Sequence, residues 1–113
     1  MMKGISTLAA VAFLTGSTID VGAQTSPIRG QGTVTCASWI SDHRNEPLIA
    51  SAQNAWLMGF VSAYYAHSGL APKVANSELI ARVTRHCREN PMDTLYQAAT
   101  GLVTEFSRGL NQN

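Results

Sequence analysis

Two cysteines far apart in the sequence place the strongest constraint on how this 113-residue chain can fold. In an oxidising compartment, a pair such as Cys36 and Cys87 is expected to form a disulfide. A bond that closes a loop of about 50 residues stabilises a small domain by on the order of 4 kcal/mol. The alternatives are two free thiols or a pair of metal ligands, but a metal site needs further ligands, and the sequence contains no CxxC or HxxxH spacing. We therefore predict a Cys36–Cys87 disulfide.

The N-terminus has the organisation of a secretory signal peptide. Residues 1–3 include a lysine, residues 5–14 are almost entirely apolar, and residues 21–23 (Val-Gly-Ala) have the small side chains that signal peptidase requires. An N-terminal membrane anchor is the alternative, but ten helical residues extend about 15 Å, half of a ~30 Å hydrocarbon core. We expect residues 1–23 to be removed, a periplasmic or otherwise secreted protein, and no stable membrane insertion.

The expected mature chain is small and carries few charges. About 90 residues form one domain that buries only about 60–65% of its unfolded surface, so a covalent tie is useful. Charged residues make up 13% of the chain, and because Lys3 and Asp20 leave together with the signal peptide, the formal net charge stays at +1. The sequence contains no basic patch of the kind that would indicate a nucleic-acid partner. A surface with so few charges tolerates self-association, and we expect a homodimer.

The first half of the mature chain predicts an arm and two helices. Residues 24–33 contain a proline, two glycines and few apolar side chains, and we expect a disordered arm. Residues 34–43 have apolar side chains at i, i+3 and i+4, which predicts a short helix. Pro47 suits the first position of a long helix that runs to Ser68, and Gly69 is placed to end that helix in the left-handed conformation.

Two further helices complete the expected fold. Ser77 is placed to cap the third helix, whose inward-facing residues are Leu79, Ile80, Val83 and Cys87. Asn90 and Pro91 end that helix and are expected to begin the fourth as N-cap and first residue, with Asp93 in its first turn. No segment alternates with a period of two, so the class is all-α. We expect a four-helix orthogonal bundle over residues 34–110, followed by a short tail, 111–113.

Both cysteines fall on apolar helix faces. Cys36 belongs to the first predicted helix and Cys87 to the end of the third, and each shares a face with apolar neighbours. Two inward-facing cysteines have the geometry that a disulfide needs. His86 next to Cys87 does not indicate an activated thiol, because adjacent helical residues point about 100° apart.

The sequence contains no pattern typical of an active site. His43, His67 and His86 lie on different segments, where we expect solvated helix-end residues. No spacing forces the carboxylates of the expected mature chain together: Asp42, Glu46, Glu78, Glu89, Asp93 and Glu105. There is no GxSxG, phosphate-binding glycine loop or cofactor fingerprint. We therefore expect no enzyme activity and assign no catalytic, cofactor-binding or metal-binding residue.

The longest predicted helix carries an unusual amount of apolar surface. Trp56, Phe60 and Tyr64 form an i, i+4 aromatic stripe, which a small bundle would ordinarily bury in its core. Leu57 and other apolar residues extend this surface around the helix, more than one core-facing stripe requires. We therefore assign a protein-binding or dimer face to Trp56, Leu57, Phe60 and Tyr64.

Several of these segments resemble the HdeA/HdeB family of periplasmic acid-stress chaperones. The matching segments are Cys36-Ala37-Ser38-Trp39, Ala55-Trp56-Leu57-Met58-Gly59-Phe60 and Cys87-Arg88-Glu89-Asn90-Pro91-Met92-Asp93-Thr94-Leu95, the last similar to the family's Cys-x-x-Asn-Pro-x-x-x-Leu ending. The resemblance implies a small disulfide-bonded bundle whose neutral dimer hides an apolar face. Acid exposes that face, which then holds unfolding client proteins. Only Cys36, Cys87 and the Asn90–Pro91 junction correspond residue by residue.

A second resemblance implies a different kind of partner. Gly59-Phe60-Val61-Ser62-Ala63-Tyr64 is similar to the central helix of Rap1a/Tai-type immunity proteins, which are small, exported, helical and disulfide-bearing. Those proteins bind and block a toxic cell-wall amidase, and they usually carry more than two cysteines. The first resemblance therefore implies many unfolded clients as partners, and the second implies one folded enzyme.

Overall fold

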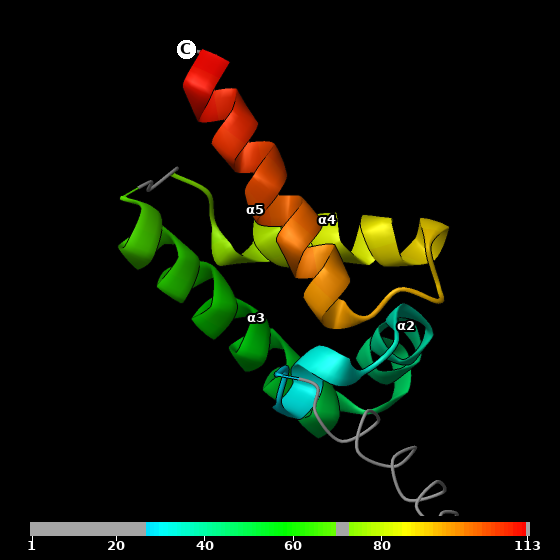
Figure 1. The fold of residues 1–113 in the computed structure, drawn as a ribbon. Helices are drawn as coiled ribbons and strands as arrows, with labels where there is room; N and C mark the ends of the chain where they lie inside the picture. The colour runs from blue at the N-terminus through cyan, green and yellow to red at the C-terminus, as the bar shows by residue number, and fades with distance from the viewer. Residues whose placement is uncertain (1–26, 70–72, 113) are drawn as a thin grey trace, which may run out of the picture.

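Four α-helices and one 3-10 turn make up the structure, a computed structural model that describes residues 27–69 and 73–112 (Figure 1). The elements are η2 (Gly30–Thr33), α2 (Cys36–Asn45), α3 (Pro47–Ser68), α4 (Asn76–Glu89) and α5 (Leu95–Gln112). The all-α prediction is confirmed. The expected signal peptide, residues 1–23, lies outside the described residues. Among the helices that are described, none combines the length and apolarity needed to cross a bilayer.

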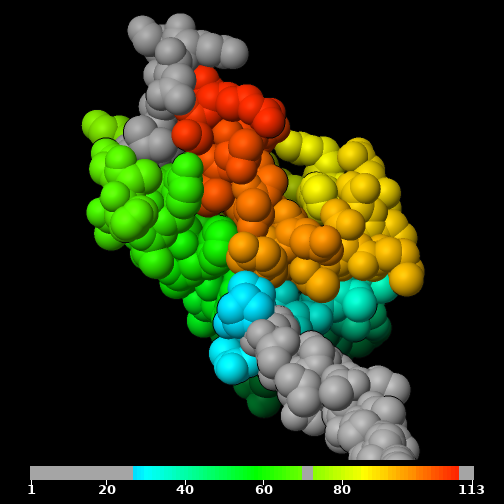
Figure 2. Space-filling model, viewed as in Figure 1, coloured from blue at the N-terminus to red at the C-terminus, as the bar shows by residue number. Residues whose placement is uncertain are grey.

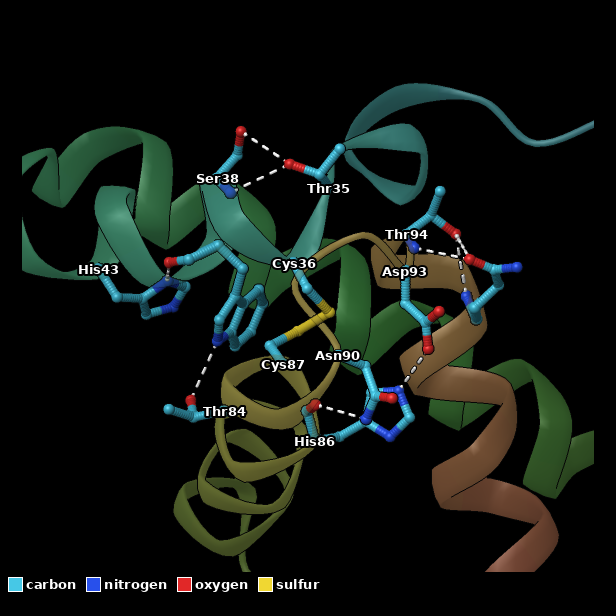
Figure 3. Close-up of a disulfide and its surroundings, with 12 residues drawn as sticks. Thr35, Cys36, Ser38, His43, Thr84, His86, Cys87, Asn90, Asp93 and Thr94 are labelled. Atoms are coloured by element: carbon cyan, nitrogen blue, oxygen red, sulfur yellow. Dashed lines mark hydrogen bonds and ion pairs between the residues drawn. A yellow bond between two sulfur atoms is a disulfide. The ribbon is translucent and has the colours of Figure 1, made fainter.

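The disulfide predicted from the sequence is present and joins α2 to α4 (Figure 3). The Cα atoms of Cys36 and Cys87 are 4.7 Å apart, and both residues are fully buried. Next to the bond, the indole of Trp39 on α2 donates a hydrogen bond to Thr84 Oγ1 on α4 at 3.0 Å. The disulfide and the indole together fix the pairing of these two helices, and such a bond is consistent with an oxidising compartment.

The core forms where the helices meet around this pair. α2 packs against α3 and α4, while α5 packs against α3 and α4. The buried apolar residues of the core are Cys36, Trp39, Leu57, Val61, Leu79, Val83, Cys87, Leu95, Ala98, Ala99, Leu102 and Val103. The predicted inward face of α4 is confirmed for three of its four residues, whereas Ile80 is only half-buried.

The long central helix has the predicted limits. Pro47 occupies its first turn, and Gly69 ends it with a φ of 79° and an N–H that donates to Tyr65 O at 2.9 Å. A positive φ is the conformation for which glycine is favoured, so this end is determined locally.

Two helix starts differ from the prediction. α4 begins at Asn76, so Ser77 lies inside the helix rather than at its cap. α5 begins at Leu95 rather than at Asn90–Pro91, because Thr94 and Gln97 form a capping box. The Gln97 N–H donates to Thr94 Oγ1 at 3.1 Å, and the Thr94 N–H donates to Gln97 Oε1 at 2.7 Å.

Residues 91–93 instead form a turn that binds the start of α2. The N–H of Cys36 donates to Asp93 O at 2.7 Å, and the N–H of Ala37 donates to Pro91 O at 3.0 Å. These are N–H groups of the first helical turn, which have no partner within their own helix. The turn therefore supplies the acceptors that α2 lacks.

The expectation of a disordered arm is wrong for residues 30–33. They form η2, which packs against α3 and the start of α5. In Figure 2 this segment, in blue and cyan, is seated against both helices. The polar, glycine-rich composition that favoured disorder also allows this close approach, because glycines leave room for a neighbouring ring.

Candidate functional site

Aromatic side chains from α3 and α5 form a continuous half-buried surface. The rings of Trp56 and Phe60 stack with centroids 5.4 Å apart, and Phe60 meets Tyr96 of α5 edge-on at 5.8 Å. Tyr64 continues the same stripe of α3, and its ring lies 5.9 Å from that of Tyr65. We call Trp56, Phe60, Tyr64 and Tyr96 the aromatic face. Aromatic rings of this kind are enriched at protein interfaces.

Leu57, the fourth residue predicted for this surface, does not belong to it. Its side chain is 0% exposed and lies in the core. One residue turns a helix by about 100°, so Leu57 points away from Trp56 and shares the inner face of α3 with Gln53 and Val61. The assignment of Leu57 to the binding face is therefore wrong. The sequence did not predict Tyr96 as part of this surface, because its position beside Phe60 depends on how α5 packs on α3.

The N-terminal turn covers the Trp56 end of the aromatic face. The indole N–H of Trp56 donates to Arg29 O at 3.0 Å. Gly32 is buried against the same ring, and a Cβ added at this position would overlap the indole and lie 2.7 Å from Ile28 Cγ2. Gly30, with a φ of 67°, also approaches the ring. We call residues 29–33 the N-terminal cover.

Replacing Gly32 with alanine is expected to displace this cover. The added methyl group has no room beneath the indole, so the hydrogen bond to Arg29 O is lost and Trp56 becomes more exposed. Tryptophan emission should shift to longer wavelength, and proteolysis before residue 34 should become faster. Gly59→Ala, on α3 where nothing lies within 4 Å, is the matched control and should leave the emission unchanged. An unchanged Gly32→Ala spectrum would contradict the cover.

Three of the polar contacts between separate elements use a carboxylate. Gln53 Nε2 donates to Asp42 Oδ2 at 2.8 Å, joining α3 to α2. His86 Nε2 lies 2.8 Å from Asp93 Oδ2, between α4 and the following turn. Arg82 on α4 binds Glu105 on α5 at 3.1 Å. Three of the six carboxylates that the sequence left scattered, Asp42, Asp93 and Glu105, therefore bridge separate elements.

Arg82 also binds Glu78 within its own helix, at 2.7 Å. The hydrogen bond to Glu78, with the charges of Glu78 and Glu105, raises the pKa of this guanidinium. All three side chains are substantially exposed, so the cluster stabilises the fold only modestly.

Two of the three histidines are less exposed to solvent than the sequence predicted. His43 is half-buried, with Nδ1 2.8 Å from Trp39 O and Nε2 2.8 Å from Asn54 Oδ1. His86 is also half-buried, against Asp93. His67 is exposed in the last turn of α3, as expected. Within residues 27–69 and 73–112, no three His, Cys, Asp or Glu side chains are grouped so that they could hold a metal ion.

Tyr65 carries a buried hydroxyl that has no hydrogen-bond partner among the described residues. Burial, followed by the neighbouring Tyr64, raises the pKa of this phenol. A raised pKa in the folded state means that the protonated phenol favours folding. The contribution of this phenol to the free energy of unfolding is complete below the pKa of tyrosine in the unfolded chain, about 10. It is lost as the pH rises through the higher pKa of the folded state.

Tyr65→Phe is therefore expected to stabilise the protein. The substitution removes an unpaired buried hydroxyl and should raise the free energy of unfolding by about 1 kcal/mol at pH 7. It should also reduce the loss of stability between pH 9 and pH 11. Urea unfolding at these three pH values measures both effects, with Tyr64→Phe as the control. A Tyr65→Phe protein less stable than wild type would show that the hydroxyl has a partner.

Comparison of the chain with models of protein families, with curated protein sequences and with solved structures finds no match.

Proposed function

We propose that this chain is an exported protein-binding protein that holds partly unfolded proteins on its aromatic face at low pH. The observation that carries the proposal is the N-terminal cover. A surface made of Trp56, Phe60, Tyr64 and Tyr96 ends beneath this cover, where the Trp56 indole donates to Arg29 O and two glycines approach the ring. The cover lies outside the core cluster and has no covalent tie to α3, so it can be displaced without dismantling the core.

Acid is expected to weaken polar contacts that join separate elements of the structure. Three of these contacts use a carboxylate, Asp42–Gln53, Asp93–His86 and Glu105–Arg82, and strong acid weakens contacts of this kind in general. Under the same conditions the expected mature chain carries about +11 of net charge, and self-repulsion favours a more open state. We infer that this self-repulsion separates α5 and the cover from α3 and exposes the aromatic rings.

The disulfide preserves a scaffold during this opening. Cys36–Cys87 joins α2 to α4 and does not depend on pH in the acid range, whereas η2 and α5 have no covalent tie to α3. The resemblance to the HdeA/HdeB family supports the same interpretation. A homodimer at neutral pH, with the partner copy on the aromatic face, and a periplasmic location are parts of this proposal.

Client aggregation at two pH values tests the proposal. The mature protein is mixed with an acid-denatured enzyme, and light scattering is followed at pH 7 and pH 2.5 while sedimentation measures the oligomeric state. We expect suppression near equimolar ratio at pH 2.5, none at pH 7, and a dimer that dissociates in acid. A protein that is inert at pH 2.5 would contradict the proposal. A stable neutral complex with one folded cell-wall enzyme would favour the inhibitor alternative.

A further inference from the structure

A groove runs along the outside of the disulfide-bonded helix pair, away from the aromatic face. Its larger part is an open cavity of about 370 Å³ between α2 and the end of α4. A second hollow of about 220 Å³ shares Ile40, Arg44 and Arg88 with it, so the two are continuous. We call this the α2–α4 groove. Cavities of several hundred Å³ are typical of small-molecule sites.

The floor of the groove is apolar. It consists of Ala37 and Ile40 from α2 and Pro91 from the turn after α4, over the buried Cys87, and Ser41 of α2 lies beside them as a polar residue. In the adjoining hollow, the side chains of Thr84 and His43 are already hydrogen-bonded. Thr84 Oγ1 accepts from Trp39 and donates to Ile80 O, and both ring nitrogens of His43 are within 2.8 Å of oxygen atoms. The floor therefore suits a hydrocarbon chain.

Two arginines lie at the rim of the groove, and neither has a carboxylate partner in the part of the chain that the structure describes. Arg44 and Arg88 are exposed and line both parts of the groove. Within the described residues neither is part of an ion pair, in contrast to Arg82, and no Asp or Glu lines the groove. A guanidinium binds carboxylate groups through paired hydrogen bonds, so the rim is complementary to an organic anion.

We propose that the α2–α4 groove binds a medium-chain fatty acid. The carboxylate lies between Arg44 and Arg88, and the alkyl chain lies over Ile40, the buried disulfide and Pro91. This site is independent of the proposed protein-binding function, since it shares no residue with the aromatic face.

Chain length and the two arginines should both determine affinity. Each methylene that reaches the floor should tighten binding about fourfold, so octanoate should bind far more tightly than acetate. Arg44→Gln and Arg88→Gln should each weaken octanoate binding roughly tenfold. Arg85→Gln is the matched control, because Arg85 is an exposed arginine of α4 that lines a different cavity.

Titration of the mature protein at pH 7.5 tests the proposal, with acetate, hexanoate and octanoate below micellar concentration, octanol, and a short apolar peptide with a free C-terminus. Calorimetry gives affinities, and amide shifts locate the site. The expected result is one saturable octanoate site with shifts over residues 37–44 and 84–91. Equal binding by wild type and both arginine variants, equal affinity for octanol, shifts confined to residues 56–64, or tighter binding of the peptide would each overturn it.

Discussion

Removal of the Cys36–Cys87 disulfide is expected to lower the free energy of unfolding by about 4 kcal/mol. The bond closes a loop with a sequence separation of 51, and in the chain-entropy treatment opening such a loop restores that much freedom to the unfolded chain. A domain of this size has a total stability of only about 5–10 kcal/mol. The reduced protein should therefore be marginally folded at 37 °C.

Urea unfolding measures this effect in three forms of the protein: oxidised wild type, wild type reduced with dithiothreitol, and the Cys36→Ala/Cys87→Ala variant. The two forms without the bond should unfold at similar, much lower urea concentrations. Arg85→Ala, an exposed change on the helix that carries Cys87, is the control and should stay within about 0.5 kcal/mol of wild type. A midpoint that does not move on reduction would contradict the assignment of the disulfide as the main brace.

Leu57→Ala is expected to lower the free energy of unfolding by about 3 kcal/mol. Leu57 is 0% exposed among the residues of the core, and its truncation removes buried apolar surface and leaves a cavity. The size of this loss in the free energy of unfolding depends on burial, because the same substitution at an exposed position removes almost no buried surface.

Leu48→Ala is the matched control for that prediction. It is the same chemical change on the same helix, but Leu48 is 87% exposed, and its effect should stay within about 0.5 kcal/mol. Thermal and urea unfolding of the two variants measure the difference. Similar stabilities for Leu57→Ala and Leu48→Ala would show that Leu57 lies on a surface, as the sequence alone suggested.

Features determined by nearby residues could be predicted from the sequence. Pro47 and Gly69 set the limits of α3 through their own backbone preferences, and the prediction of both ends is confirmed. The disulfide was predicted from two cysteines on apolar helix faces and from the expected export of the chain, and it too is confirmed.

Features determined by distant residues could not be predicted in the same way. Asn90–Pro91 and Thr94 both resemble helix starts. The capping box with Gln97 favours Thr94, and the N–H groups at the start of α2 bind the carbonyls of Pro91 and Asp93, which keeps this segment out of the helix. The N-terminal cover is ordered because Gly32 fits beneath Trp56, which lies in another element.

The aromatic face was only partly predictable for a related reason. α3 is apolar around much of its circumference, so periodicity alone does not say which stripe faces the core. Packing against α5 decides this, placing Leu57 inside and leaving Phe60 beside Tyr96. The α2–α4 groove likewise depends on how two helices meet.

The most direct test of the aromatic face is client protection by the Phe60→Ser/Tyr64→Ser variant at pH 2.5. Circular dichroism at pH 7 first establishes that it folds, and Leu48→Ser/Met92→Ser, which removes two exposed apolar side chains elsewhere, is the control. We predict that the aromatic variant fails to suppress client aggregation while the control protects as well as wild type. Full protection by the folded aromatic variant would contradict the role of this face.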